Sequence, residues 1–404
     1  MNFDKSPLPL VVAVVGHRDP IPDLIPKLRK NFRNHLKKIT RELPSTPIYM
    51  LNGLAKGMDT EAAEVFLEVI SEQKETTSKN INHKLIATLP KSVESYISSF
   101  SSQEEAQRLK ALLSKCSAVL DPTNSKGLRG ASSDNKEQPS PFCYIKQGVF
   151  LVRHSLLLFA FYDGIEVFEK GGTCQSVAMQ KGDYPKFSLS LDELLNSKNN
   201  GCLVEYYTPR RRHSSLNNYS TRLTCNYWKN KQKILERKVV NENDITYLLD
   251  TPKQIIEEIN KNLTTQSFNS YEDNESQTAL RSFACKKAKR FKGKDINSGW
   301  IWLFLGWFIT ISLAQPPYQL YGLLFLSLFL IFNPTPSKYI KNDFIKYRAL
   351  VEALDIQEIG LKLGIDLDTA DSFHIHQDLK LDWVRSILLA RRIHLKAIYA
   401  NKSP

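Results

Sequence analysis

Short, continuous apolar runs alternate with longer, partly polar stretches over residues 1–208. The longer stretches suit helices, of which the clearest are Asp23–Glu42, Thr60–Gln73 and Ser102–Ser114. The apolar runs suit strands, and they are Val11–Val15, Ile48–Asn52, Lys84–Leu89, Ala118–Leu120, Leu156–Tyr162 and Cys202–Tyr207. Strands that are apolar throughout are typical of a parallel sheet covered by helices on both faces. The pattern therefore predicts an α/β fold with an open, doubly wound, mainly parallel sheet.

Residues 209–298 differ in character from what precedes them. They open with Arg210-Arg211-Arg212, are rich in Lys and Asn, and end in the basic stretch CKKAKRFKGK. We expect a basic, partly helical and partly disordered connector here. The polar stretch before it, Ser125–Pro141, is expected to be a long loop.

No charged residue occurs in the 41 positions from Asn297 to Ser337. Gln315-Pro316-Pro317 divides this stretch into two apolar halves, which predicts two transmembrane helices over residues 299–333. Lys and Arg flank both halves and are absent between them, so both termini are expected on the cytoplasmic side of the inner membrane. The alternative is a buried helical hairpin in a soluble core.

Residues 334–404 predict C-terminal cytoplasmic helices. Leu350, Leu354 and Leu361 recur at roughly helical spacing within Phe344–Leu363, and Trp383 and Ile387 do so within Asp378–Ala400. Such amphipathic helices suit oligomer packing, and a helix lying on the membrane surface is the alternative.

Composition narrows the class of partner. A net charge of +13, from 55 Lys and Arg against 42 Asp and Glu, favours anionic partners such as lipid headgroups, nucleic acid or a phosphorylated ligand. The 42% of hydrophobic residues excludes general disorder. The six cysteines form no CxxC pair, so no metal site is expected.

Three glycine-containing turns follow predicted strands. The first carries Gly16, His17 and Arg18, the second runs from Gly53 to Asp59, and the third pairs Asp163-Gly164 with Gly171-Gly172-Thr173 before a helix. Glycines at the start of a helix leave backbone amides open to an anion. Asp59 suits a helix N-cap better than a catalyst, although it is also placed to accept hydrogen bonds from ribose hydroxyls.

The order of these motifs resembles a known superfamily. VVGHRDP, GLAKGMDTEAAEVF, HSLLLFAFYDG and GGT are similar to the signature of the DNA-processing-protein/Lonely-Guy (SLOG) superfamily, over about residues 8–208. The resemblance implies a Rossmann-like domain over residues 1–208 that binds a nucleotide-derived ligand. Arg210, after the last predicted strand, fits either a phosphate contact or a solvated turn. The implied ligand-binding residues are Gly16, His17, Arg18, Gly53, Leu54, Gly57, Asp59, Asp163, Gly164, Gly171, Gly172, Thr173 and Arg210.

The C-terminal region carries a second resemblance. Two apolar spans followed by KYRALVEALDIQEIG and DWVR are similar to SLATT proteins, two-transmembrane effectors of bacterial conflict systems. This resemblance implies an antiviral-defence membrane effector that senses a nucleotide second messenger and then disrupts the inner membrane, as in abortive infection. The implied partners are a messenger from a neighbouring synthase, membrane lipids and further copies of the chain, with no nucleic acid.

One departure bears on catalysis. Lonely-Guy hydrolases carry a PGGxGTxxE loop with a catalytic Glu, whereas this chain reads EKGGTCQSVA and has Ser176 at the equivalent place. We therefore expect no catalytic residue and no cofactor, only a nucleotide-derived ligand that is cyclic ADP-ribose-like or a cyclic oligonucleotide. The alternatives are a membrane-tethered nucleotide N-glycosidase and a single-stranded DNA binder.

Overall fold

The computed structural model forms two compact units, which are described separately. The sheet unit comprises residues 6–268 and 360–404, and the helical unit comprises residues 269–359 with the first five residues. The helical unit is thus an insertion in the sequence of the sheet unit. The structure describes residues 7–76, 81–122, 140–165, 171–181, 202–211, 221–228, 235–240, 250–265, 279–314, 337–362, 369–372 and 382–399.

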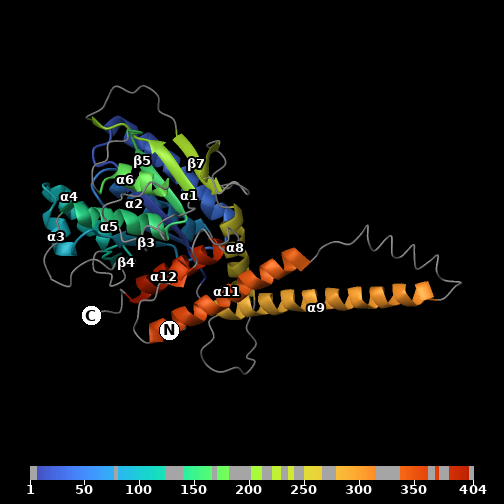
Figure 1. Cartoon of the computed structure of the whole chain (residues 1–404). Helices are drawn as coiled ribbons and strands as arrows, with labels where there is room; N and C mark the ends of the chain where they lie inside the picture. Colours follow the sequence, from blue (N-terminus) through green and yellow to red (C-terminus); the bar gives the residue numbers. More distant parts are fainter. Residues whose placement is uncertain are drawn as a thin grey trace. The chain divides into compact units, whose positions relative to one another are not determined.

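An eight-stranded sheet in the order β4-β3-β2-β1-β5-β6-β7-β8 forms the centre of the sheet unit (Figure 1). Its first six strands in this order are parallel, which makes the domain Rossmann-like. They are β1 (Leu10–Gly16), β2 (Ile48–Asn52), β3 (Lys84–Thr88), β4 (Ala118–Leu120), β5 (Leu157–Tyr162) and β6 (Cys202–Tyr207). Two antiparallel strands, β7 (Thr221–Trp228) and β8 (Leu235–Val240), extend the sheet beyond β6.

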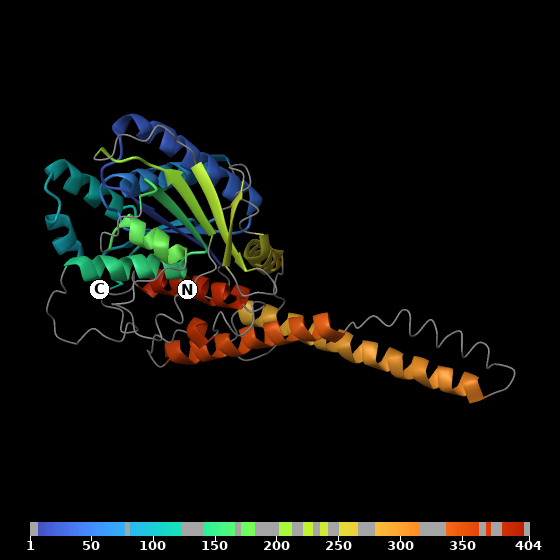
Figure 2. The ribbon, with the colours of Figure 1, turned by 45° about the horizontal axis from the view of Figure 1, so that its top comes forward.

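Helices cover both faces of this sheet. Along β1, Leu10, Val12 and Val14 face one core, and Val11, Ala13 and Val15 face the other, because successive strand residues point to opposite sides. The first core contains side chains of α1 (Ile25–Glu42), α2 (Met58–Thr76) and α4 (Gln103–Leu113). The second contains side chains of α5 (Ser140–His154), α6 (Thr173–Gln180) and α12 (Asp382–Tyr399), which lie on the opposite side from α1 in Figure 2.

The six parallel strands confirm the predicted α/β class, and their ends agree with the predicted ranges to within a residue. In the predicted connector, α8 (Asp250–Thr265) agrees with the expected helical part, whereas the strands β7 and β8 were not expected. The structure also differs at the end of the predicted loop, because α5 begins at Ser140. Residues 125–139 of that loop lie outside the described part of the chain.

Buried polar contacts attach α8 to the sheet. The Asn260 amide nitrogen donates to the carbonyl oxygen of Leu8 (2.9 Å) and to Oγ1 of Thr46 (2.9 Å), and its oxygen accepts from the Leu8 amide (2.8 Å). Thr46 in turn donates to Glu257 (2.6 Å). Since Asn260 is fully buried, these bonds replace water that the side chain loses.

The last helix, α12, belongs to the sheet unit. Its residues Ala390, Ile393 and Ala397 are buried in the second core. The hydroxyl oxygen of Tyr49 in β2 lies 2.8 Å from Nδ1 of His394 in α12. The apolar face of this helix, which the sequence analysis assigned to oligomer packing, therefore covers the chain's own sheet. A period of 3.6 residues indicates that a helix face is buried without indicating what covers it.

Two helices form the described part of the helical unit, α9 (Ala279–Ala314) and α11 (Ser337–Lys362). They run antiparallel, because Arg281 pairs with Asp355 while Phe291 stacks on Tyr347, ring centroids 5.8 Å apart. The first predicted span lies in α9, and the second lies outside the described residues. Within the described part of the chain, we find no helix with the length and apolarity needed to cross a membrane.

Candidate functional site

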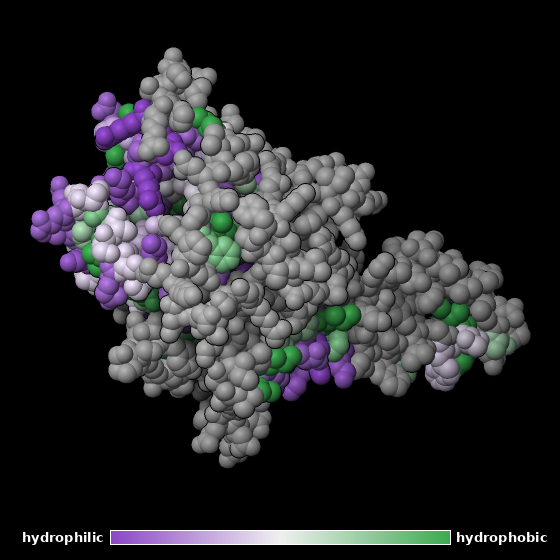
Figure 3. All heavy atoms as spheres, turned by 60° about the vertical axis from the view of Figure 1, so that its left-hand side comes forward, coloured by the Kyte–Doolittle hydropathy of each residue, from purple (hydrophilic) through white to green (hydrophobic). Residues whose placement is uncertain are grey.

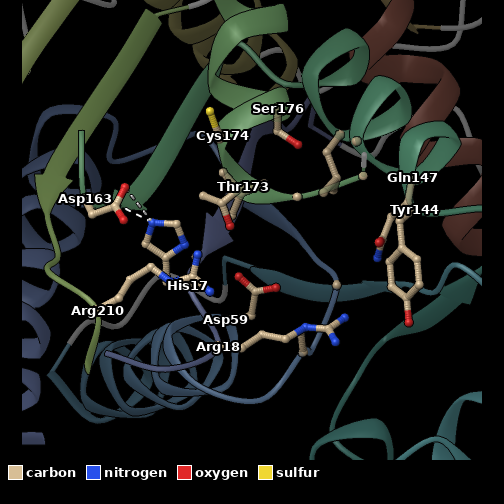
Figure 4. A pocket seen from close by; sticks show the side chains of 18 of the residues that line it. His17, Arg18, Asp59, Tyr144, Gln147, Asp163, Thr173, Cys174, Ser176 and Arg210 are labelled. Atoms are coloured by element: carbon tan, nitrogen blue, oxygen red, sulfur yellow. Dashed lines mark hydrogen bonds and ion pairs between the residues drawn. The ribbon is translucent and has the colours of Figure 1, made fainter. Parts of the chain in front are cut away.

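A cavity of about 320 Å³, called the main cavity below, lies in the sheet unit where β1, β2 and β5 end. β1 has β2 on one side and β5 on the other, and such a reversal of strand order is where open α/β sheets bind ligands. Figure 4 shows the principal side chains of the main cavity. The cavity is lined by Val15, Gly16, His17, Arg18, Gly53, Ala55, Asp59, Tyr96, Tyr144, Gln147, Gly148, Leu151, Asp163, Ile165, Gly171, Gly172, Thr173, Cys174, Ser176 and Arg210.

The loop after β1 contacts the end of β5. His17 is buried, and its Nε2 lies 3.1 Å from the amide nitrogen of Asp163 and 3.2 Å from Oδ1 of the same residue. An unprotonated Nε2 accepts from the amide, whereas a protonated one donates to the carboxylate, so the ring keeps a partner in either state. Burial raises the pKa of Asp163, but hydrogen bonds from His17 and the Ile165 amide outweigh this effect and lower it below the usual value. Asp163 is therefore a fixed negative charge.

Asp59 is the most unusual titratable group in the cavity. Its side chain is buried, and Oδ1 has no hydrogen-bond partner within the described residues. Burial raises the pKa of this carboxyl to about 7, although the charge of Arg18 opposes the rise. The residue lies inside the first turn of α2 rather than before it, so the expected N-cap role is not what the structure gives. Asp59 nevertheless lines the cavity, where a carboxyl suits a ligand hydroxyl such as that of a ribose.

Backbone requirements explain three expected binding residues that do not line the cavity. Leu54 is buried with a φ of 51°, and its amide donates to Oδ1 of Asn52 (2.6 Å). Gly57 has a φ of 88°, and a Cβ there would lie 2.5 Å from the carbonyl oxygen of His17. Gly164 also has a positive φ, 80°. These residues shape the turns that carry the lining residues.

The cavity has an anion-binding side at the start of α6. Gly172 is the N-cap of α6 and has no side chain that could cap the helix, and Gly172, Thr173 and Cys174 line the cavity at this end of it. The Gly171 amide is occupied, because it donates to Oε1 of Gln175 (2.6 Å). The positive end of the helix dipole at this wall favours a phosphate or carboxylate.

Two arginines add positive charge. Arg18 is exposed to solvent, and Arg210 donates through Nε to Oδ1 of Asp19 (2.8 Å). This ion pair, with a bridge between Pro20 and Arg210, holds the end of β6 against the loop after β1. Arg210 thus lines the cavity as a partly neutralised cation.

The opposite wall was not predicted from the sequence. It comes from α3 (Val93–Ser98) and α5, which supply Tyr96, Tyr144 and Gln147. The Tyr96 hydroxyl donates to the carbonyl oxygen of Gly53 (3.1 Å), and Gln147 donates to that of Thr88 (2.5 Å). The guanidinium carbon of Arg18 lies 5.3 Å from the centre of the Tyr144 ring, within cation–π range. A signal for α5 was available in Ser140-Pro141, a typical helix start.

No protein-family model matches this chain, and no curated protein matches its sequence. Within the described residues, no group of three or more His, Cys, Asp or Glu side chains could hold a metal ion. The chemistry of the site therefore follows from its own geometry. It combines the N-terminal end of α6 and arginines on one side with aromatic and amide side chains on the other.

Proposed function

We propose that the sheet unit binds a nucleotide-derived messenger in the main cavity and that binding switches the helical unit to disrupt a membrane. The proposed binding of a nucleotide rests on one observation: the two sides of the main cavity suit different parts of a nucleotide. The start of α6 suits a phosphate, and the Tyr144 ring offers a surface on which a nucleobase can stack. Asp59 also lines the cavity, and its carboxyl suits a ribose hydroxyl.

The surface of α9 supports the membrane half of the proposal. Lys286, Lys289, Arg290 and Lys292 are exposed near its beginning. Phe304, Trp307 and Ile311, at helical spacing, are 65%, 67% and 44% exposed near its end, and Figure 3 shows green side chains on this helix. Exposed apolar side chains following a basic segment are typical of contact with an anionic lipid surface. We infer a position at the inner membrane, with both termini cytoplasmic and several copies acting together.

Coupling between the two units requires a difference in affinity. A messenger can activate the helical unit only if it binds the active state more tightly than the resting state. The helical unit is inserted between residues 268 and 360, and the elements on either side of it in the sequence, α8 and α12, both pack on the sheet unit. A change in the sheet unit on binding would thus reach both ends of the insertion.

The test is dye leakage from cells that carry the full chain with or without the synthase of the messenger. Arg18→Ala removes a charge-assisted contact worth about 1.5–3 kcal/mol, roughly a ten- to hundred-fold loss of affinity. Gly172→Glu places a carboxylate at the proposed phosphate position, and its φ of −88° is compatible with any residue. We expect leakage with the wild-type chain only when the synthase is present, and little leakage with either variant.

Arg41→Ala is the matched control, because Arg41 is exposed on α1 away from the cavity. It should leak like the wild type. Equal leakage from all four chains would show that the cavity does not control the helical unit, and the proposal would then be wrong.

A nucleotide N-glycosidase is the second candidate, and Asp59 is the observation that favours it. A carboxyl with a pKa of about 7 is suited to general acid catalysis near neutral pH. The position of the hydrolase Glu, however, is occupied by Ser176, which lines the cavity. Release of free base from nucleoside monophosphates separates this candidate from a binding function.

A further inference from the structure

A second cavity, of about 180 Å³, adjoins the main one. Four residues, Arg18, Ala55, Tyr96 and Tyr144, line both cavities and so form a shared wall. The remaining lining residues of the second cavity are Lys56, Ser99, Phe100, Ser101 and Glu105. They come from the loop after β2 and from the segment that joins α3 to α4.

The shared wall contains groups suited to both cavities. The guanidinium of Arg18 lies over the Tyr144 ring, and its exposure leaves hydrogen-bond donors for a ligand on either side. Tyr96 is fixed by its bond to Gly53 and packs edge-on against Phe100, with ring centroids 5.4 Å apart. A phosphate held by Arg18 would therefore sit at the passage from one cavity to the other.

The second cavity has the chemistry of a nucleoside site rather than a phosphate site. Phe100 and Tyr144 supply aromatic surface, and Ser101 supplies an exposed hydroxyl. The Ser99 hydroxyl donates to the carbonyl oxygen of Tyr96 (2.7 Å) and can still accept a hydrogen bond. The charge of Lys56 is paired with Glu105, whose Oε1 lies 3.4 Å from its ammonium nitrogen. A neutralised ion pair gives little attraction for a second phosphate, but it offers both a donor and an acceptor to a base or ribose.

The volume of the main cavity also favours a ligand that extends into the second cavity. At about 320 Å³ the main cavity is at the small end of the ~300–1,000 Å³ typical of ligand pockets, so a ligand larger than one nucleotide must extend beyond it. The second cavity is the neighbouring space that shares its wall.

We propose that the ligand is a dinucleotide. One nucleotide occupies the main cavity with phosphate at the start of α6, and the second nucleoside passes Arg18 and Tyr144 into the second cavity. This inference rests on the proposed messenger site and names its ligand class. A continuous polynucleotide is a poorer fit, because the Lys56–Glu105 pair offers no net positive charge to a further phosphate and Glu104, next to it in the first turn of α4, adds a negative charge.

The experiment is calorimetric titration of the full-length protein. The mononucleotide probes are AMP and ADP, and the dinucleotide probes are NAD, diadenosine diphosphate and cyclic di-AMP. At least one dinucleotide should bind ten-fold or more tightly than either mononucleotide. Ser101→Trp fills the second cavity from an exposed position and should reduce dinucleotide binding at least ten-fold, with mononucleotide binding changed less than two-fold. Ser98→Trp, exposed on α3 and lining neither cavity, should change neither.

The outcomes separate this inference from the function on which it rests. Mononucleotide binding that Gly172→Glu abolishes, without any gain for the dinucleotides, refutes the second site and leaves the messenger site standing. No binding of any probe refutes both. Tighter binding of a dT oligonucleotide than of every dinucleotide, lost in Ser101→Trp, would assign the second cavity to single-stranded DNA instead.

Discussion

The raised pKa of Asp59 makes the stability of this protein depend on pH in a direction that is unusual for an aspartate. The folded protein keeps a proton on Asp59 up to about pH 7, whereas the unfolded chain loses it near the usual aspartate value of 3.8. Between these values the folded state binds more protons, so stability falls as pH rises. The contribution is fully present below pH 3.8 and is lost as pH passes 7.

The magnitude follows from the two pKa values. Each unit of difference corresponds to about 1.4 kcal/mol, so ionising Asp59 in the folded state costs up to about 4 kcal/mol. Asp59→Asn keeps the shape of the protonated side chain and cannot ionise. We expect the variant to gain about 4 kcal/mol relative to the wild type between pH 4 and pH 8. Other titrating groups cancel in this difference because both proteins share them.

Urea denaturation of both full-length proteins at several pH values measures this gain. Asp23→Asn is the matched control, since Asp23 is exposed and the substitution removes the same charge. It should show no pH-dependent difference from the wild type. If the difference between Asp59→Asn and the wild type stays constant from pH 4 to pH 8, Asp59 is ionised in the folded protein, and the reasoning from its burial is wrong.

Three further predictions follow from other contacts. Asn260→Ala leaves the buried amide and carbonyl of Leu8 without their partner and should destabilise the sheet unit by about 3 kcal/mol in denaturant titrations, whereas Asn262→Ala, at a partly exposed position, should cost little. Gly57→Ala places a Cβ against the His17 carbonyl at a φ of 88° and should cost more than ~1 kcal/mol and weaken nucleotide binding in calorimetry. Chromatography should detect no free base after incubation with AMP, and base release abolished by Asp163→Ala would establish a hydrolase.

The parallel sheet could be predicted because its strands are apolar on both faces, a pattern that needs no knowledge of the rest of the chain. β1 is buried along its whole length, and its limits are marked by Pro9 before it and by His17-Arg18 after it. The same approach failed for β7 and β8, where polar residues such as Arg222 and Asn226 interrupt the sequence. These strands form as an antiparallel extension of β6, and that pairing depends on residues distant in sequence.

Only the residues on one side of the main cavity could be predicted from the sequence. Gly16, Gly53 and Gly172 could be located because turns at the carboxyl ends of parallel strands meet at one edge of the sheet. Tyr144 and Gln147 could not, because α5 buries Gln147 and Lys146 among apolar residues and lacks a clear apolar stripe. Helices of this kind are identified from tertiary contacts, which a single sequence does not contain.

The place of α12 in the second core has a consequence for synthesis on the ribosome. Its residues are translated after the whole helical unit, yet Ile393 and Ala397 complete the packing beneath β1 and β2. The helix α9 therefore emerges while one face of the sheet, already covered by α5 and α6, still lacks the part of its cover that α12 supplies. Until α12 is made, Val11, Ala13 and their neighbours in the second core stay partly open, so this core can close only after the helical unit has been synthesised.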